Sequence, residues 1–147
     1  MRQLIYRMPD GSTKEFNLDK FTEHYLIAAL FTEEERLAED SSTPERSFGL
    51  LDFAASAIER AIKDCTEFQH AWPELLAAAY ELYLPHVDAP TPQCSAGHDF
   101  WFTRNGHGVG FWDRGFGRKL GDELTDACKA CKEVTIELGD DGELHFF

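Results

Sequence analysis

Hydrophobic and polar positions at the start of the chain follow the pattern of a β-hairpin. Residues 3–6 and 12–16 each mix apolar and polar side chains over the length of a short strand. Between them stands Asp10-Gly11, a pair typical of tight turns because glycine adopts positive φ angles freely. The chain is therefore expected to open with a short hairpin.

A helical period follows this hairpin. Apolar positions recur every three to four residues, which is the spacing of one helix face, and they predict helices over residues 18–37, 43–68 and 73–84. Pro44 and Pro73 stand where the second and third helices begin, a place that tolerates proline because the N–H groups of the first turn have no intrahelical acceptor.

The remaining chain divides into a connector and a compact unit. Residues 86–97 contain prolines and small polar residues, so they are predicted to connect elements rather than to form one. Beyond them the pattern predicts a hairpin over 99–114, a helix over 119–131 and a final hairpin over 134–147 around an Asp-Asp-Gly turn.

These elements predict an α+β fold in a single domain, residues 1–147. An N-terminal hairpin and a helical part, about 18–85, would pack against a ββαββ antiparallel-sheet unit over about 98–147. A length of 147 residues with 43% hydrophobic content is sufficient for one packed core.

The most distinctive stretch is 99–115, DFWFTRNGHGVGFWDRG, in which two aromatic runs flank Asn105-Gly106. Read as a hairpin, it places the phenylalanines on one face, and packing accounts best for them. Its polar remainder resembles a ligand or partner site. The candidate binding residues are Arg104, Asn105, His107, Thr103, Arg114, Trp101 and Trp112. Arg104, Asn105 and His107 are expected at the exposed tip.

Two other uses of this stretch remain open. His107 could act as a general base oriented by Asp99 or Asp113, so that a small enzyme or ligand-binding protein would use Asp99, Arg104, His107 and Asp113. Alternatively, Trp101 and Trp112 could stack on the bases of a single-stranded nucleic acid.

Metal ligands are also conceivable, since Cys94 and His98 are spaced i, i+4 and Cys128 and Cys131 are spaced i, i+3. The last two cysteines belong to an apolar helical stripe, where cysteine behaves as a small hydrophobic residue. We therefore expect no metal and no cofactor. Four cysteines without a signal peptide are expected to be reduced thiols of a cytoplasmic protein.

The chain carries a net charge of −13. Such charge repels phosphate and makes direct DNA binding unfavourable, while it suits a protein that covers a basic surface, for instance by mimicking DNA. The residues proposed for an acidic face are Glu33, Glu34, Glu35, Glu39 and Asp40. Simple solubility is the alternative use of this charge. No apolar run is long enough to predict a membrane span.

The string HDFWFTRNGHGVGFWDRG, with residues 121–125 and 139–142 and the upstream segment 57–68, resembles a family of small uncharacterised proteins of tailed bacteriophages and prophages. The chain departs from this family at Cys131-Lys132, where members carry an aromatic residue and a glycine. The resemblance covers about the last two thirds of the chain.

The resemblance implies a setting and no reaction. It leads us to expect a small acidic phage protein, monomeric or homodimeric, in the cytoplasm of the bacterial host. There it would bind and modulate or inhibit a host or anti-phage defence protein, and the candidate partners include proteins that bind nucleic acid.

Overall fold

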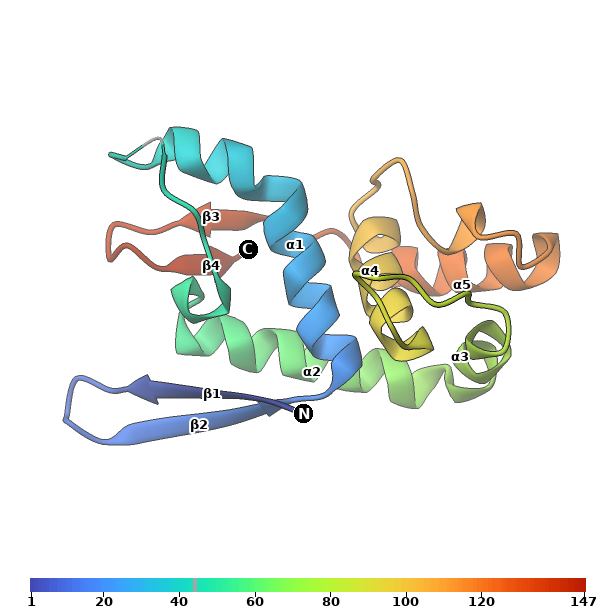
Figure 1. Cartoon of the computed structure of the whole chain (residues 1–147), viewed down its shortest axis with the longest axis horizontal. Coiled ribbons are helices and arrows are strands. Elements are labelled where there is room, and N and C mark those ends of the chain that lie inside the picture. Colours follow the sequence, from blue (N-terminus) through green and yellow to red (C-terminus); the bar gives the residue numbers. More distant parts are fainter. Residues whose placement is uncertain (44) are drawn as a thin grey trace.

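A computed structural model describes residues 1–43 and 45–147. Within this part the chain forms five α-helices, two 3-10 turns and two antiparallel two-stranded sheets, which confirms the α+β class (Figure 1). The two sheets are separate hairpins, one near each terminus, and the helices lie between and beside them.

The N-terminal hairpin forms as predicted. Strands β1 (Arg2–Arg7) and β2 (Thr13–Leu18) pair in antiparallel register, with Leu4 opposite Phe16. Gly11 takes a φ of 86° in the connecting turn. Leu4 and Phe16 are buried while most neighbouring side chains are exposed, so one face of the hairpin packs on the molecule.

Helix α1 (Lys20–Asp40) agrees with the first predicted helix. It begins at Asp19, whose carboxylate accepts a hydrogen bond of 2.7 Å from the backbone N–H of Thr22. Its first half is covered by other elements on most sides, whereas its second half is largely exposed, and ten of its residues are buried.

Helix α2 (Ala55–Ala71) begins later than predicted. Pro44, placed in its first turn by the sequence, lies outside the described residues, and the 3-10 turn η1 (Leu50–Asp52) precedes the helix. The backbone N–H of Ala54 donates to the carbonyl of Leu144 over 2.9 Å, which ties the segment before α2 to the C-terminal hairpin. Helix α3 (Pro73–Tyr80) starts at the predicted proline and ends earlier than predicted.

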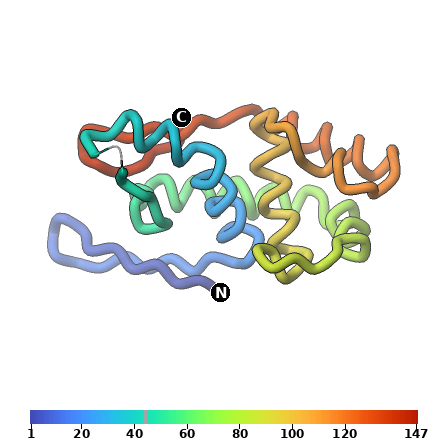
Figure 2. Tube along the Cα trace, turned by 45° about the horizontal axis from the view of Figure 1, so that its top comes forward, coloured from blue at the N-terminus to red at the C-terminus, as the bar shows by residue number. Residues whose placement is uncertain are grey.

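The prediction of a connector over 86–97 and a hairpin over 99–114 was wrong, because helix α4 (Pro92–Arg104) runs from the middle of the first range into the second and replaces the first strand of the hairpin. The Thr91 hydroxyl accepts a hydrogen bond from the N–H of Cys94 at its start, and Pro92 follows the cap. Helix α4 lies beside α1 in the middle of the molecule (Figures 1 and 2). A helix covered on most sides shows no simple apolar stripe, which left its aromatic residues open to interpretation as strand.

After α4 the chain turns through the 3-10 turn η2 (Phe111–Asp113) into α5 (Arg118–Ala130). Asn105-Gly106 does mark a turn, with a Gly106 φ of 70°, but this turn ends a helix. The predicted ββαββ unit therefore does not form. Its second half is confirmed by α5 and by the pairing of β3 (Ile136–Leu138) with β4 (Leu144–Phe146).

One apolar cluster extends through the described chain. It contains side chains from both hairpins and from all five helices, and its centre is aromatic. The rings of Phe68 and Phe100 stack with centroids 4.2 Å apart, and Tyr25 contacts both Phe100 and Trp101. None of the described helices has the length and apolar character needed to cross a membrane.

Candidate functional site

The buried carboxylate of Asp99 is held by side chains from two other segments. Arg114 donates from Nε and Nη2 to both carboxylate oxygens over 2.6 to 3.1 Å, and the Tyr83 hydroxyl donates over 2.5 Å. Burial raises the pKa of Asp99, and the hydrogen bonds from Arg114 and Tyr83 oppose this rise. Through these hydrogen bonds Asp99 connects α4 to Tyr83, which precedes the helix, and to Arg114, which follows it.

Arg104, expected at an exposed tip, is only 5% exposed, so this prediction was wrong. Its guanidinium donates to the Asp64 carboxylate over 2.7 Å and to the Tyr25 hydroxyl over 3.1 Å. It also donates to the backbone carbonyls of Lys132 and Cys131. The helical conformation turns this side chain inward, where it joins four oxygen atoms from three segments.

The neighbouring polar residues also serve the turn after α4. Asn105 accepts from the N–H of Val134 over 2.8 Å, and the Thr103 hydroxyl accepts from the N–H of Phe111 over 3.1 Å. The His107 ring packs against Trp101 and Phe102. These contacts fix the path of the chain from α4 to η2 and to β3.

The two tryptophans do not form one stacking platform. Trp101 is buried and donates from Nε1 to the Thr32 hydroxyl over 2.9 Å, whereas Trp112 is 51% exposed. A nucleic-acid base could reach only the second ring, so the pair proposed for base stacking is not assembled.

The residues proposed for an enzyme site do not form one catalytic group, because they bind different partners. Asp99 is bound by Arg114, Arg104 is bound by Asp64, and the described chain contains no ion pair between His107 and either Asp99 or Asp113. Asp113 is exposed. The structure therefore offers no oriented acid and base at the positions that the sequence suggested.

The four proposed metal ligands do not converge. Cys94 contacts the Thr91 hydroxyl, and Cys128 and Cys131 lie on α5, where burial raises the pKa of both thiols. In residues 1–43 and 45–147, the one group of three or more potential ligand side chains within 4.8 Å of one another is Asp141, Glu143 and His145. His98 does not face these cysteines, because its ring contacts the ring of His24 on α1.

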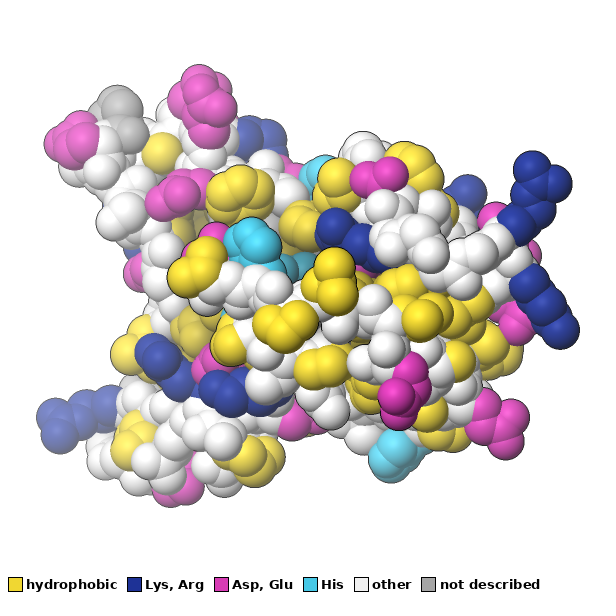
Figure 3. All heavy atoms as spheres, turned by 45° about the vertical axis from the view of Figure 1, so that its right-hand side comes forward, with side chains coloured by type: hydrophobic (Ala, Val, Ile, Leu, Met, Phe, Trp, Pro, Cys, Tyr) yellow, Lys and Arg dark blue, Asp and Glu magenta, His cyan; other side chains and the backbone are white. Residues whose placement is uncertain are grey.

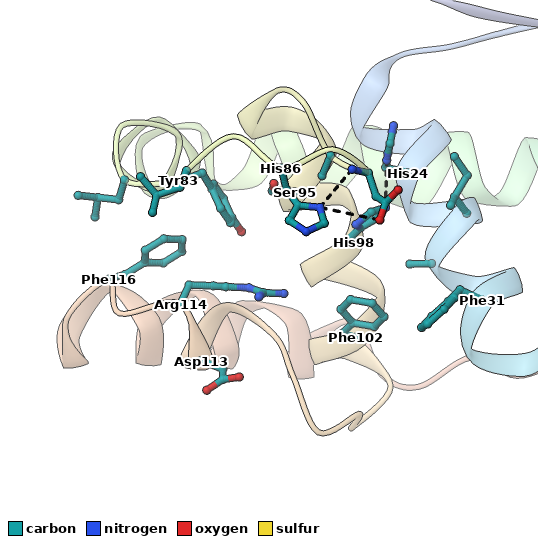
Figure 4. A pocket seen from close by; sticks show the side chains of 16 residues that line it. His24, Phe31, Tyr83, His86, Ser95, His98, Phe102, Asp113, Arg114 and Phe116 are labelled. Carbon is teal, nitrogen blue, oxygen red and sulfur yellow. Dashed lines mark hydrogen bonds and ion pairs between the residues drawn. The ribbon is translucent and has the colours of Figure 1, made fainter.

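An open cleft of about 920 Å³ lies between α1, α4, residues 82–89 and residues 113–116. Hydrophobic side chains gather around histidines on the face shown in Figure 3. In the close view of Figure 4, His24 and Phe31 come from α1, His98 and Phe102 come from α4, and Phe116 lies at the opposite end. This volume is in the range of known ligand sites.

The cleft has apolar walls on both helices. Ile27 and Phe31 of α1 and Phe102 of α4 line it at helical spacing, and Leu82 and Leu84 line it from the segment after α3. Phe31 is 77% exposed and Leu84 is 84% exposed. Large apolar side chains exposed together in this way are characteristic of a surface that another molecule covers.

Two histidines meet at one wall of the cleft. The Nδ1 atom of His24 lies 2.9 Å from the Nε2 atom of His98, a distance at which one imidazole donates a hydrogen bond to the other. Burial lowers the pKa of both rings, and for His98, with further repulsion from His24 and Arg114, it lowers the pKa to about 4. Both rings are therefore neutral at physiological pH.

The proposed acidic face lies on the last turns of α1, beyond the cleft. Arg36 pairs with Glu33 over 2.8 Å and with Asp40 over 3.4 Å, which neutralises part of the charge there. Glu34, Glu35 and Glu39 are exposed. Glu34 and Glu35 follow Phe31 by three and four residues, so they share its side of the helix.

Searches against protein-family models, curated proteins and solved structures each found no match to this chain. The function of the cleft is therefore inferred from its own chemistry.

Sequence reasoning missed the cleft because it read α4 as a hairpin. A signal was present in the spacing of Ser95, His98 and Phe102, which places them on one side of a helix. His24 and Phe31 are seven positions apart, as Ser95 and Phe102 are, so they also lie on one side of their helix, α1. Only the packing of α1 against α4 brings the two sets together.

Proposed function

We propose that this protein is a small acidic binding protein of a bacteriophage. It would dock on a host or anti-phage defence protein in the bacterial cytoplasm and modulate or inhibit it. The observation that carries the proposal is the cleft whose rim exposes Phe31 and Leu84, in a chain with a net charge of −13. The phage setting rests on the resemblance of residues 98–115 to phage proteins.

The proposed occupant is an apolar segment of the partner that also carries basic side chains. Apolar anchors would enter between Phe31, Phe102 and Leu84, where burial of each large side chain contributes about 1.5–3 kcal/mol before the costs of association. Basic side chains beside those anchors would meet Glu34 and Glu35, which continue the same side of α1.

The exposed carboxylates beside the cleft would also allow this protein to mimic DNA. A protein that binds nucleic acid has a basic groove, and the exposed carboxylates on α1 would enter it as phosphates do. The cleft would add apolar contacts that DNA cannot make. The charge would speed association, and the apolar contacts would slow dissociation.

The first test uses two synthetic helical peptides as probes, one of leucine and lysine and one of leucine and glutamate. Fluorescence anisotropy should show binding of the lysine peptide and none of the glutamate peptide. The double variant Phe31→Ser, Leu84→Ser should weaken binding at least tenfold while keeping every charge. The matched control Leu51→Ser removes an apolar side chain, 61% exposed, that does not line the cleft, and it should bind as the parent does.

The second test is affinity purification from infected cells followed by mass spectrometry, with the parent, the double variant and Leu51→Ser as baits. A partner that is kept by Leu51→Ser and lost by the double variant would support the cleft as the docking surface. Retention of the same partner by the double variant would overturn that assignment. A dimer in sedimentation that only the double variant abolishes would show that a second copy occupies the cleft instead.

A further inference from the structure

The histidine pair in the cleft has the geometry of two metal ligands. His24 comes from α1 and His98 from α4, two helices that pack directly against each other, so both rings are held by regular structure. Their facing nitrogens lie 2.9 Å apart. Two imidazole nitrogens that are each about 2.0–2.1 Å from one metal ion lie about 2.9 Å apart at the right angle of square-planar or tetragonal sites, and about 3.3 Å apart at the tetrahedral angle that zinc prefers.

The hydrogen bond within the pair also bears on metal binding. A metal ion binds imidazole through a nitrogen lone pair, and a hydrogen bond between two ring nitrogens requires that one of them already presents its lone pair. In the hydrogen-bonded pair a single proton lies between the two facing nitrogens. A metal ion that enters releases that proton or moves it to the outer nitrogen of one ring.

A carboxylate lies beside the outer nitrogen of His24. Glu23 Oε1 is 3.6 Å from His24 Nε2, and Glu23 is itself largely buried. A carboxylate in this position favours the proton on Nε2 and leaves the Nδ1 lone pair free for a metal. Carboxylate–histidine–metal arrangements of this kind are common in metalloproteins.

We propose that His24 Nδ1 and His98 Nε2 bind a late first-row divalent metal ion that accepts right-angle coordination, Ni²⁺ or Cu²⁺, at the wall of the cleft. Imidazole nitrogen suits these ions. Among the described residues no third histidine, cysteine or carboxylate completes a three-ligand group with this pair. The remaining positions of the metal therefore face the cleft and take water or a donor atom of the bound molecule.

The competing site is the exposed group Asp141, Glu143 and His145 in the C-terminal hairpin. Its His145 ring already contacts the Asp141 carboxylate over 2.9 Å. This group lies outside the cleft, so its variants separate the two sites. The partly exposed thiol of Cys131 is a further soft ligand, and Cys131→Ser removes it from the background.

The test is isothermal titration of Ni²⁺ into the Cys131→Ser chain without any partner. One ion should bind per chain, His24→Gln and His98→Gln should each weaken binding at least tenfold, and His145→Gln should leave it unchanged. Loss of binding in His145→Gln alone, or equal binding by the parent and the double variant His24→Gln, His98→Gln, would overturn the proposal.

A second measurement keeps the test valid if a variant fails to fold. Electron paramagnetic resonance of Cu²⁺ bound to the Cys131→Ser chain should show two coordinated imidazole nitrogens. A signal with one nitrogen would contradict the pair and point to His145. Because no partner is present in either measurement, failure of the metal site leaves the proposed docking function standing, and the reverse also holds.

Discussion

At the scale of single residues, Arg104 shows how a polar side chain can organise a fold. It is a cation enclosed by protein, and its donors reach the Asp64 carboxylate, the Tyr25 hydroxyl and two backbone carbonyls. Each acceptor would lose a partner if the guanidinium were removed. A buried charge left without its partner costs far more than the intact pair contributes.

We therefore predict that Arg104→Met lowers the free energy of unfolding by about 3–5 kcal/mol. Urea unfolding followed by circular dichroism measures this change. Arg118→Met, on the exposed first turn of α5, is the control and should stay within about 0.5 kcal/mol of the parent. A loss below about 1 kcal/mol in Arg104→Met would mean that these hydrogen bonds do not organise the turn.

His98 gives the stability a defined dependence on pH. Its pKa is about 4 in the folded chain against an ordinary value of 6.5. Between these values the unfolded chain binds a proton that the folded chain does not, so the free energy of unfolding falls as the pH decreases from 6.5 to 4. The full shift corresponds to about 3 kcal/mol, and solvent screening of this partly exposed ring reduces the contribution to about 2 kcal/mol. His24 titrates with His98 because the rings are hydrogen bonded.

The measurement is urea unfolding of the parent and of His98→Gln at several pH values. The parent should lose more stability than the variant over this window, and both should change alike above pH 7. Parallel curves over the whole range would contradict the assignment of this pH dependence to His98.

At the scale of elements, the close approach of α1 and α4 decides the shape of the site. Gly97 faces α1, and a Cβ atom there would lie 2.1 Å from the carbonyl oxygen of Phe21. Backbone atoms cannot yield as a flexible side chain can. Glycine therefore allows the two helices to lie close enough for His24 and His98 to meet.

Gly97→Ala is predicted to destabilise the protein by more than about 2 kcal/mol, since it forces two packed helices apart. Thermal unfolding measures the loss, and nuclear magnetic resonance of the imidazoles should show that the histidine contact has changed. Gly49→Ala, where a Cβ meets no atom within 4 Å, should have a small effect. Equal effects of the two substitutions would show that helix approach is not the reason for glycine at this position.

The elements themselves differed in how well the sequence predicted them. The N-terminal hairpin, α1, α5 and the final hairpin were foreseeable because each has a local turn signal or one exposed face. Helix α4 was not, because it is covered on most sides and its residues Phe100 to Phe102 are as compatible with alternation in a strand. For the same reason the polar residues after Asp99 were interpreted as a hairpin tip, although most of them hold the chain together.

At the scale of the whole molecule, the net charge of −13 acts on both stability and binding. Several ion pairs are exposed, and such pairs contribute little. Repulsion among the excess carboxylates therefore outweighs them at low ionic strength. Salt shortens the range of this repulsion, since the Debye length falls from about 30 Å at 0.01 M to about 3 Å at 1 M.

Stability should therefore rise when sodium chloride increases from low to high concentration, as measured by thermal unfolding. The triple variant Glu34→Gln, Glu35→Gln, Glu39→Gln should be more stable than the parent at low salt and equal to it at high salt. A parent that salt destabilises would show that its ion pairs outweigh its net repulsion. The same variant should bind the leucine and lysine peptide more weakly.

The sequence by itself determined the α+β class, the terminal hairpins and the acidic character, because turn signals, hydrophobic periods and charge act locally or add along the chain. Only the tertiary structure decided which side chains form a site. It buried Arg104 and Trp101, and it joined His24 to His98 across seventy-four positions of sequence. The physical reason is that burial and contact between distant residues depend on how helices pack, and a helix enclosed by neighbours leaves no periodic trace of that packing.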